Sequence, residues 1–245
     1  HHICKPFLGL LGTDFFACSQ KAGDWMYTKK INQKKLHVIN NAIDCEAFAY
    51  NEPIRQQYRQ LFGILDDEIL IGHVGRFMYQ KNHEFLIDIF ETLHQMNKKA
   101  KLILIGEGDT ESKIREKVRT HGLSDSVIFA GVRNDVNCCM QAMDLFLLPS
   151  LFEGLPVVGI EAQAAGLPCL MSDTITKETN LFGLVEFASL RNSPEMWADK
   201  IMSMLVNFSR KDTTDEMTLN GYNTKEQESS LVNIYSILQS RNDME

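Results

Sequence analysis

The chain has 245 residues, and its hydrophobic share of 44% is ordinary for a globular protein that buries a full core. Its net charge of -7 argues against a surface for nucleic acid, because phosphate backbones are held by basic faces. No apolar stretch reaches the roughly 18 residues of a membrane span, which predicts a soluble chain.

The chain before Glu68 shows few regular patterns. Apolar runs predict one strand at residues 15–19 and another at residues 37–39, and Asn40-Asn41 with Asp44 marks a turn that leaves the second strand. These elements are too few for a separate core. We therefore expect residues 1–43 to be the remnant of a preceding domain together with a linker.

From Glu68 onward, short apolar runs alternate with amphipathic stretches. This alternation predicts right-handed βαβ units and a doubly wound parallel sheet, which is an α/β fold of the Rossmann-like class. We assign residues 44–224 to this domain, with a polar loop at 209–224, and residues 225–245 to a C-terminal helix. The expected strands are residues 69–74, 102–105, 127–130, 145–148, 169–171 and 185–187, and the expected helices are residues 83–96, 110–121, 134–142, 157–165, 193–206 and 225–239.

Two loops follow the strands that flank the expected switch point of the sheet. In a sheet of order 3-2-1-4-5-6, ligands bind at the carboxyl ends of strands 1 and 4. The loop after strand 1, GRFMYQKN (residues 75–82), brings the cations Arg76 and Lys81 to this crevice. A pyrophosphate is a ligand whose charge justifies holding two cations close together. In the loop after strand 4, PSLFEGLP (residues 149–156), Gly154 allows a close backbone approach, and Pro156 suits the first turn of a helix whose amides face an anion.

Two glutamates, Glu153 and Glu161, flank the start of this helix with seven residues between them. A carboxylate can accept hydrogen bonds from two vicinal hydroxyls at once. We therefore expect one glutamate for each sugar ring, Glu161 for a ribose and Glu153 for a second sugar. Taken alone, each charged residue is also consistent with a solvated surface position, and it is the placement at the switch point that favours a site.

Several other polar residues are better explained by structure than by binding. His73, inside strand 1, is expected to be a packed histidine with a satisfied ring, and His83 is expected to open a helix. Gly106-Glu107-Gly108 resembles a phosphate-binding loop, but it follows a strand that lies away from the switch point. We therefore interpret it as the turn before a helix. Whether Asp173 lines the site is left open.

The cysteines lack the paired spacing of disulfide frameworks and zinc sites, and they lie among apolar neighbours. This pattern predicts reduced thiols in a cytoplasmic protein and no metal site. Adjacent residues on a helix point in different directions, so two neighbouring cysteines there are expected to pack rather than to bind zinc. The six residues are Cys4, Cys18, Cys45, Cys138, Cys139 and Cys169.

The segments GRFMYQKN and PSLFEGLPVVGIEAQAAGLP (residues 149–168) resemble the donor-site signatures of glycosyltransferase family 4, especially the bacterial exopolysaccharide and capsule enzymes. The pair of glutamates separated by seven residues is part of that resemblance. VINNAIDCEAF (residues 38–48) is similar to the linker into the C-terminal domain of these enzymes, and ACSQKAGDWMY (residues 17–27) to the last elements of their N-terminal domain. The resemblance extends over about residues 15–238.

The resemblance implies a GT-B fold and a retaining, metal-independent transfer of a sugar from a nucleoside-diphosphate sugar, with a UDP-sugar as the first choice. Arg76 and Lys81 would bind the diphosphate and stabilise it as it departs. Glu161 would bind the ribose and Glu153 the donor sugar, so Glu153, Arg76 and Lys81 are the candidate catalytic residues. The further implied contacts are Val132, Arg133 and Asn134 with the base through backbone groups, and Gly154, Leu155, Pro156 and Val157 with the donor sugar through the backbone.

The resemblance also implies a lipid-linked or saccharide acceptor, bound by an N-terminal domain that is missing from the front of the chain. The enzyme would act in the cytoplasm, and peripheral association of the full-length protein with the inner face of the cell membrane is left open. Leu155-Pro156 departs from the Phe-Gly of many members. A non-catalytic nucleotide-sugar-binding module and a UDP-sugar epimerase of GT-B fold remain as alternatives, whereas an NAD oxidoreductase is disfavoured because GxGxxG does not follow strand 1.

Overall fold

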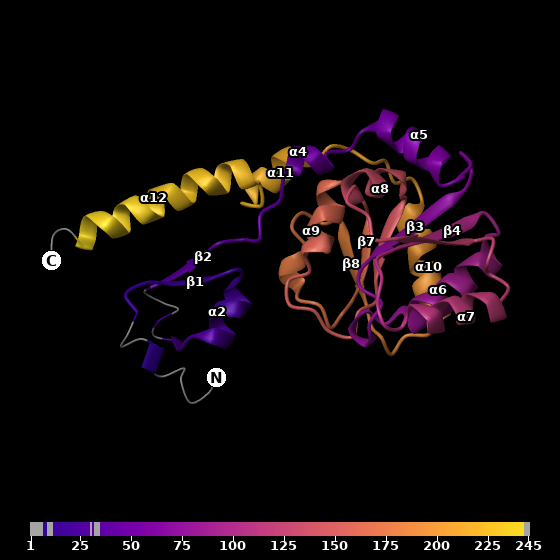
Figure 1. Cartoon of the computed structure of the whole chain (residues 1–245), viewed down its shortest axis with the longest axis horizontal. Coiled ribbons are helices and arrows are strands. Elements are labelled where there is room, and N and C mark those ends of the chain that lie inside the picture. The colour runs from indigo at the N-terminus through magenta and orange to yellow at the C-terminus, as the bar shows by residue number, and fades with distance from the viewer. Residues whose placement is uncertain (1–6, 9–11, 30, 32–34, 243–245) are drawn as a thin grey trace. The chain divides into compact units, whose positions relative to one another are not determined.

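The chain folds as two units in the computed structural model, which describes residues 7–8, 12–29, 31 and 35–242. Unit 1 comprises residues 1–45 and 217–245, and unit 2 comprises residues 46–216 (Figure 1). All of the site residues expected from the sequence lie in unit 2.

Unit 2 is built on a six-stranded sheet in which every neighbouring pair of strands is parallel. The spatial order is β5-β4-β3-β6-β7-β8, which confirms the expected order 3-2-1-4-5-6 and its switch point between β3 and β6. The strands are β3 (Ile69–Val74), β4 (Ala100–Ile105), β5 (Val127–Gly131), β6 (Leu145–Leu148), β7 (Cys169–Ser172) and β8 (Val185–Ala188).

Successive side chains of a strand point to opposite faces of the sheet, and here each face has its own buried cluster. Ile71 packs in the cluster that contains α6 (His83–Met96), α7 (Glu111–Thr120) and α10 (Pro194–Leu205). Leu70 packs in the opposite cluster with α8 (Val136–Ala142) and α9 (Val157–Ala164). Figure 1 shows these helices on the two sides of the sheet. Because both faces are covered, the strands are apolar throughout, which is why they could be found as continuous runs in the sequence.

Four of the described α-helices were not expected from the sequence, and three of them begin at or after residue 45. α5 (Glu52–Leu61) begins where the side chain of Asn51 accepts a hydrogen bond from the Ile54 amide at 3.1 Å. α4 (Cys45–Phe48) precedes it, and α11 (Thr214–Leu219) lies inside the stretch 209–224 that we expected to be a loop. The expectation of an uninterrupted loop was therefore wrong. Both α4 and α11 are too short to show a helical repeat of apolar residues.

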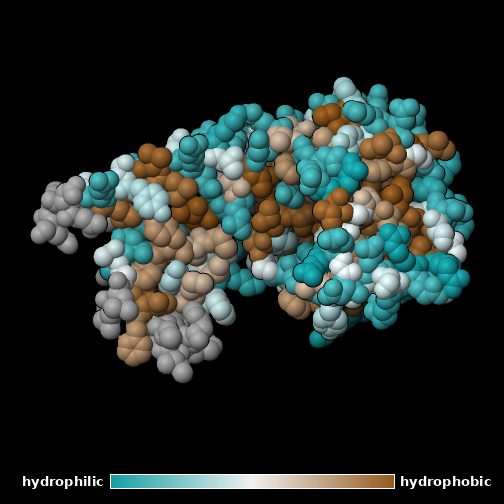
Figure 2. All heavy atoms as spheres, in the orientation of Figure 1, coloured by the Kyte–Doolittle hydropathy of each residue, from teal (hydrophilic) through white to brown (hydrophobic). Residues whose placement is uncertain are grey.

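Unit 1 contains two short parallel strands, β1 (Phe15–Ala17) and β2 (Leu36–Val38), with the helices α2 (Gln20–Met26) and α12 (Thr224–Asn242). β1 ends earlier than expected because Ser19 caps α2, accepting a hydrogen bond from the Ala22 amide at 3.1 Å. Figure 2 shows apolar side chains on the visible face of this unit. Its exposed large apolar residues include Trp25, Val38, Val232 and Tyr235. No described helix is long and apolar enough to cross a membrane.

Candidate functional site

The candidate site lies at the carboxyl ends of β3 and β6, where the winding of the sheet reverses. The loop after β3 contains a short 3-10 helix, η2 (Tyr79–Lys81), and the loop after β6 leads into α9. The structure therefore places the two loops identified in the sequence next to the switch point, as the strand order requires.

Hydrogen bonds join these two loops directly. The Leu151 amide donates to the Gln80 carbonyl at 2.8 Å, and the Asn82 side chain donates to the Pro149 carbonyl at 3.1 Å. Asn82 adopts a left-handed backbone conformation, with φ of 57°, between η2 and α6. Asparagine tolerates this conformation better than most residues, and it lets the chain enter α6 directly after η2. The position of Lys81 is thus fixed relative to the loop that contains Glu153.

The central contact of the site is an ion pair between Lys81 and Glu153. Lys81 Nζ lies 2.7 Å from Glu153 Oε1, and the two side chains are only 14% and 9% exposed. Two neutral groups also donate to this carboxylate: Ser150 Oγ to Oε1 at 2.9 Å, and Gln80 Nε2 to Oε2 at 2.9 Å. Sequence reasoning missed Ser150 and Gln80, although both stand inside the two loops it selected, because neutral polar residues are common in any turn.

Arg76 stands apart from this pair and lines an open cavity of about 850 Å³. Its side chain is exposed, and within the described part of the chain it makes no hydrogen bond or ion pair. The ends of β3 and β4, the loops after β3, β4 and β5, and the first residues of α7 and α8 line this cavity: Val74, Gly75, Arg76, Ile105, Gly106, Glu107, Gly108, Asp109, Glu111, Val132, Arg133 and Val136. A free guanidinium at the rim of such a cavity can bind a phosphate group.

The turn Gly106-Glu107-Gly108 brings two loop backbones close together. A Cβ on Gly106 would lie 2.3 Å from the Gly75 carbonyl oxygen, and one on Gly108 would lie 2.4 Å from that of Phe77. Both glycines also have positive φ angles, 135° and 156°. α7 begins at Glu111, so the turn does precede a helix, as expected. The same turn also lines the cavity of Arg76, which the sequence argument did not anticipate.

The loop of residues 132–134 contributes to this cavity through Val132 and Arg133. The guanidinium of Arg133 is held by Asp135, with Nε donating to Oδ1 at 2.8 Å, and Tyr58 donates to the other carboxylate oxygen at 2.6 Å. These hydrogen bonds, that of Arg133 above all, lower the pKa of Asp135 to about 2. Asp135 thus holds the Arg133 guanidinium in place through Nε and Nη2, and the backbone of the loop lies beside it at the cavity, while Asn134 is exposed and outside the cavity lining.

Glu161 lies on α9 and is partly buried. Burial raises the pKa of its carboxyl above the ordinary value, and it makes no hydrogen bond or ion pair within the described residues. α9 begins at Val157, directly after Pro156, without a side-chain cap for its first turn. Gly154 faces open space, because a Cβ there would meet nothing within 4 Å. The structure thus joins Lys81 to Glu153 but records no contact from Arg76 or Glu161 to that pair.

The two histidines beneath this site are buried in the core. His83 opens α6, as expected, and stacks on Phe77 with ring centroids 4.2 Å apart. The expectation of a satisfied ring for His73 was half right: Nδ1 lies 2.9 Å from the Leu147 carbonyl oxygen, but buried Nε2 has no partner among the described atoms. Desolvation lowers the pKa of both histidines, to about 4 for His83. They are therefore neutral at physiological pH.

The described cysteines, Cys18, Cys45, Cys138, Cys139 and Cys169, are free thiols, while Cys4 lies outside the described residues. Burial raises the pKa of Cys139 to about 11, so this thiol is an unreactive core group. Within the described ranges, no three His, Cys, Asp or Glu residues are grouped closely enough to hold a metal ion.

Comparison with known proteins gives the family. The profile of the glycosyl transferases group 1 family matches residues 54–223. The "Putative glycosyltransferase EpsF" of Bacillus subtilis (strain 168) is 35% identical over 229 residues, an alignment that covers 92% of this chain and 60% of EpsF. The UDP-Gal:alpha-D-GlcNAc-diphosphoundecaprenol alpha-1,3-galactosyltransferase of Escherichia coli is 29% identical over 146 residues, covering 58% of this chain and 38% of that protein. The chain thus spans less than two thirds of the length of these relatives.

Solved structures share the fold. The crystal structure of Anabaena Alr3699/HepE in complex with UDP and glucose superimposes with a TM-score of 0.77 at 18% identity, covering 96% of this chain and 66% of that one. The lipopolysaccharide glycosyltransferase WaaG gives a TM-score of 0.66 at 22% identity, covering 78% and 53%. These structural neighbours have the GT-B architecture that the sequence resemblance implied. Because the family profile matches most of the length of the chain, the chain belongs to the glycosyl transferases group 1 family.

Proposed function

We propose that this chain is the C-terminal, donor-binding part of a retaining family 4 glycosyltransferase. The full-length enzyme would transfer a sugar from a nucleoside-diphosphate sugar, a UDP-sugar in first place, to a lipid-linked or oligosaccharide acceptor in exopolysaccharide or capsule synthesis. It would act in the cytoplasm, at the inner face of the cell membrane. The observation that carries the proposal is the Lys81–Glu153 ion pair, which ties the two switch-point loops together at the edge where ligands bind in sheets of this order.

Arg76 and Lys81 would hold the two phosphates of the donor. Among the described residues, the Arg76 guanidinium is free at the rim of the cavity, and the ammonium group of Lys81, which has three donors, contacts Glu153. When the bond between the sugar C1 and the phosphate oxygen breaks, negative charge develops on that oxygen. Two fixed cations stabilise this charge without a metal ion, since they need no reorganisation at the moment of reaction.

Glu161 would bind the ribose. A partly buried carboxylate without a hydrogen-bond partner has lost solvation that nothing inside the described chain replaces, and its raised pKa reflects this loss. Two vicinal hydroxyls supply the donors that such a group lacks. The base would lie in the cavity beside residues 132–134, against backbone groups, next to an Arg133 side chain that Asp135 holds in place.

Two relatives support the choice of donor and acceptor class by their names. The Escherichia coli relative is named for UDP-galactose and a diphosphoundecaprenol-linked acceptor. Anabaena Alr3699/HepE was crystallised with UDP and glucose. We extend both features to this protein as part of the proposal.

The proposal is tested by calorimetry of this chain with UDP, GDP and NAD. We expect micromolar binding of UDP and a loss of about tenfold in Glu161→Ala, which removes hydrogen bonds to a charged acceptor. Binding of NAD in place of the nucleoside diphosphates would contradict the proposal. A non-catalytic module is distinguished from a transferase with the longer protein and a labelled donor, by counting the sugar transferred.

A further inference from the structure

The carboxylate of Glu153 is nearly filled by partners from within the chain. Its two oxygens offer about four acceptor positions. Oε1 accepts from Lys81 Nζ at 2.7 Å and from Ser150 Oγ at 2.9 Å, and Oε2 accepts from Gln80 Nε2 at 2.9 Å. One position is therefore left, on Oε2. Such a group can take one further hydroxyl, and not the vicinal pair that we expected from the sequence alone.

Gln80 is the residue that occupies Oε2. Its side-chain amide donates to Glu153 Oε2 and also to the Phe152 carbonyl oxygen, both at 2.9 Å. Both amide hydrogens are thus used on acceptors, so the opposite orientation of the amide would place its oxygen against two acceptors. The Gln80 carbonyl in turn accepts from the Leu151 amide. The amide of Gln80 is therefore fixed by the loop whose glutamate it contacts.

We propose that Gln80 is a specificity-determining residue for the donor sugar. By filling one acceptor position of Oε2, it limits Glu153 to a single hydroxyl of the bound sugar and so sets which arrangement of hydroxyls fits. This inference rests on the proposed function, in which Glu153 contacts the transferred sugar. It also distinguishes the two glutamates, since Glu161 accepts no hydrogen bond from the described residues and keeps its acceptor positions for a vicinal diol.

The amide at position 80 matters because it can donate without carrying charge. A second carboxylate at this distance would repel Glu153, and one of the two pKa values would rise strongly. An apolar side chain of similar size would leave the Oε2 position open to a second sugar hydroxyl or to water. Gln80→Leu and Gln80→Glu therefore disturb the same contact in two separate ways.

The first experiment measures the affinity of this chain and of Gln80→Leu for UDP, UDP-glucose, UDP-galactose and UDP-N-acetylglucosamine by calorimetry. Affinity for UDP should stay within about twofold, because Gln80 contacts the glutamate of the sugar and not of the ribose. The ratio of affinities between the best and the poorest UDP-sugar should change by about fivefold or more. The matched control is Gln56→Leu, since exposed Gln56 also donates to a glutamate, Glu52, at 3.1 Å on α5.

The second experiment follows Gln80→Glu with pH, using the UDP-sugar that the parent chain binds best. At about pH 5.5 a protonated Glu at position 80 can donate to Glu153 as the amide does, and affinity should approach that of the parent. By about pH 8 both carboxyls are ionised, and affinity should fall about fivefold or more relative to the parent at the same pH. A purely structural role for Gln80 would not produce this dependence of affinity on pH. The Gln80→Glu experiment also tests the proposal if Gln80→Leu does not fold.

The outcomes separate the two claims. A parent chain that binds none of the UDP ligands overturns the proposed function and this inference with it. If the parent binds UDP but Gln80→Leu keeps the order and spread of the sugar affinities, and Gln80→Glu follows the parent across the pH range, only the role of Gln80 is overturned. A changed spread in Gln80→Leu but not in Gln56→Leu supports that role.

Discussion

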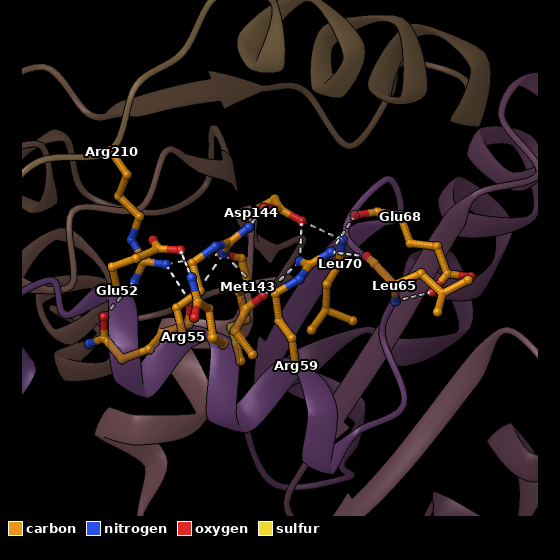
Figure 3. A network of polar contacts seen from close by, with 12 residues as sticks. Glu52, Arg55, Arg59, Leu65, Glu68, Leu70, Met143, Asp144 and Arg210 are labelled. Atoms are coloured by element: carbon orange, nitrogen blue, oxygen red, sulfur yellow. Dashed lines mark hydrogen bonds and ion pairs between the residues drawn. The ribbon is translucent and has the colours of Figure 1, made fainter.

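In unit 2, the amino ends of the strands form one edge of the sheet and their carboxyl ends form the opposite edge. Charged residues gather at both edges, but the two groups differ in how many of their hydrogen-bonding groups are used inside the protein. At the amino edge, Arg55, Arg59, Asp144 and Arg210 form a network that we call the amino-edge network (Figure 3). At the carboxyl edge lie Arg76, Lys81, Glu153 and Glu161, which we call the carboxyl-edge group. The first is satisfied by the chain itself. In the second, Arg76 and Glu161 make no hydrogen bond or ion pair with the described residues, so this is the edge with capacity left for a ligand.

The amino-edge network satisfies backbone groups that the end of α8 leaves without partners. Arg55 donates to the carbonyls of Gln141, Ala142 and Met143, and Arg210 to those of Met140, Gln141 and Met143. The last carbonyls of a helix lack partners within the helix, and cations there also interact favourably with the helix dipole. Burial, together with the nearby charge of Arg55, lowers the pKa of Arg210.

Asp144 joins this network to the sheet. Its carboxylate accepts from Arg55 at 2.5 Å, from Arg59 at 3.1 Å and from the Leu70 amide at 2.7 Å. Asp144 directly precedes β6, whose other end leads to Glu153, and Leu70 belongs to the neighbouring strand β3. The amino-edge network therefore fixes the two strands that carry the switch-point loops, although it lies at the opposite edge.

The largest effect is expected from Asp144→Ala. The substitution leaves two arginines and a backbone amide without their carboxylate, which should destabilise the chain by about 3 kcal/mol, the lower end for breaking a buried ion pair. The melting temperature should fall by roughly 6–12 °C. Calorimetric UDP binding below the melting temperature should stay unchanged, because the substitution leaves the carboxyl-edge residues in place. Asp144→Asn keeps one acceptor oxygen, and its melting temperature should lie between those of the parent and of Asp144→Ala. A melting temperature equal to the parent's in both variants would refute the role given to this network.

A smaller effect is expected at the carboxyl edge, where Arg76→Met and Lys81→Met form a matched pair. Each removes one cation from the proposed phosphate site and should weaken UDP binding by about ten- to a hundredfold, or about 1.5–3 kcal/mol. Arg76→Met should leave the melting temperature unchanged, since the Arg76 guanidinium is exposed and makes no hydrogen bond or ion pair with the described residues. Lys81→Met should also lower the melting temperature, because it leaves the 9% exposed carboxylate of Glu153 without its cation. Equal melting temperatures for the two variants would show that the ion pair has no structural role.

This comparison also shows what the sequence could and could not predict. The sheet was predictable because its strands are buried on both faces: the bounds of β3 and β6 agree with the apolar runs, and the strand order is one that is common in the doubly wound class that the alternation with helices predicts. The loops after β3 and β6 were predictable for the same reason. The roles of Arg76, Glu161 and the other site residues stay predictions, as do the domain limits at residues 43 and 224.

The amino-edge network was not predictable, because its members come from α5, from the residue before β6 and from the segment after α10. Arg59 and Arg210 are far apart in the sequence and meet only through the carbonyls around the end of α8. α5 itself was missed because its residues are mainly polar, and because it packs through Arg55 and Arg59 of this network as well as through apolar side chains. Gln80 was overlooked for a related reason: its role depends on Glu153, which lies on another loop.

The smallest effect is the pH dependence expected of Glu161, which tests whether its lack of partners reflects a place for a ligand. Burial raises the pKa of this carboxyl above the ordinary 4.5, so the folded, ligand-free chain holds the proton more tightly than the unfolded chain. Stability from this group is then greatest below pH 4.5 and is lost as the pH rises through the raised pKa, so Glu161→Gln should be at least as stable as the parent at neutral pH.

Ribose hydroxyls favour the ionised form of the Glu161 carboxyl. UDP affinity of the parent should therefore rise with pH from 4.5 up to the raised pKa and then level off, while Glu161→Gln lacks this component and binds severalfold more weakly at neutral pH. Titration of the phosphates contributes equally to both chains, so the difference between their calorimetric profiles isolates Glu161; parallel profiles would place the ribose elsewhere.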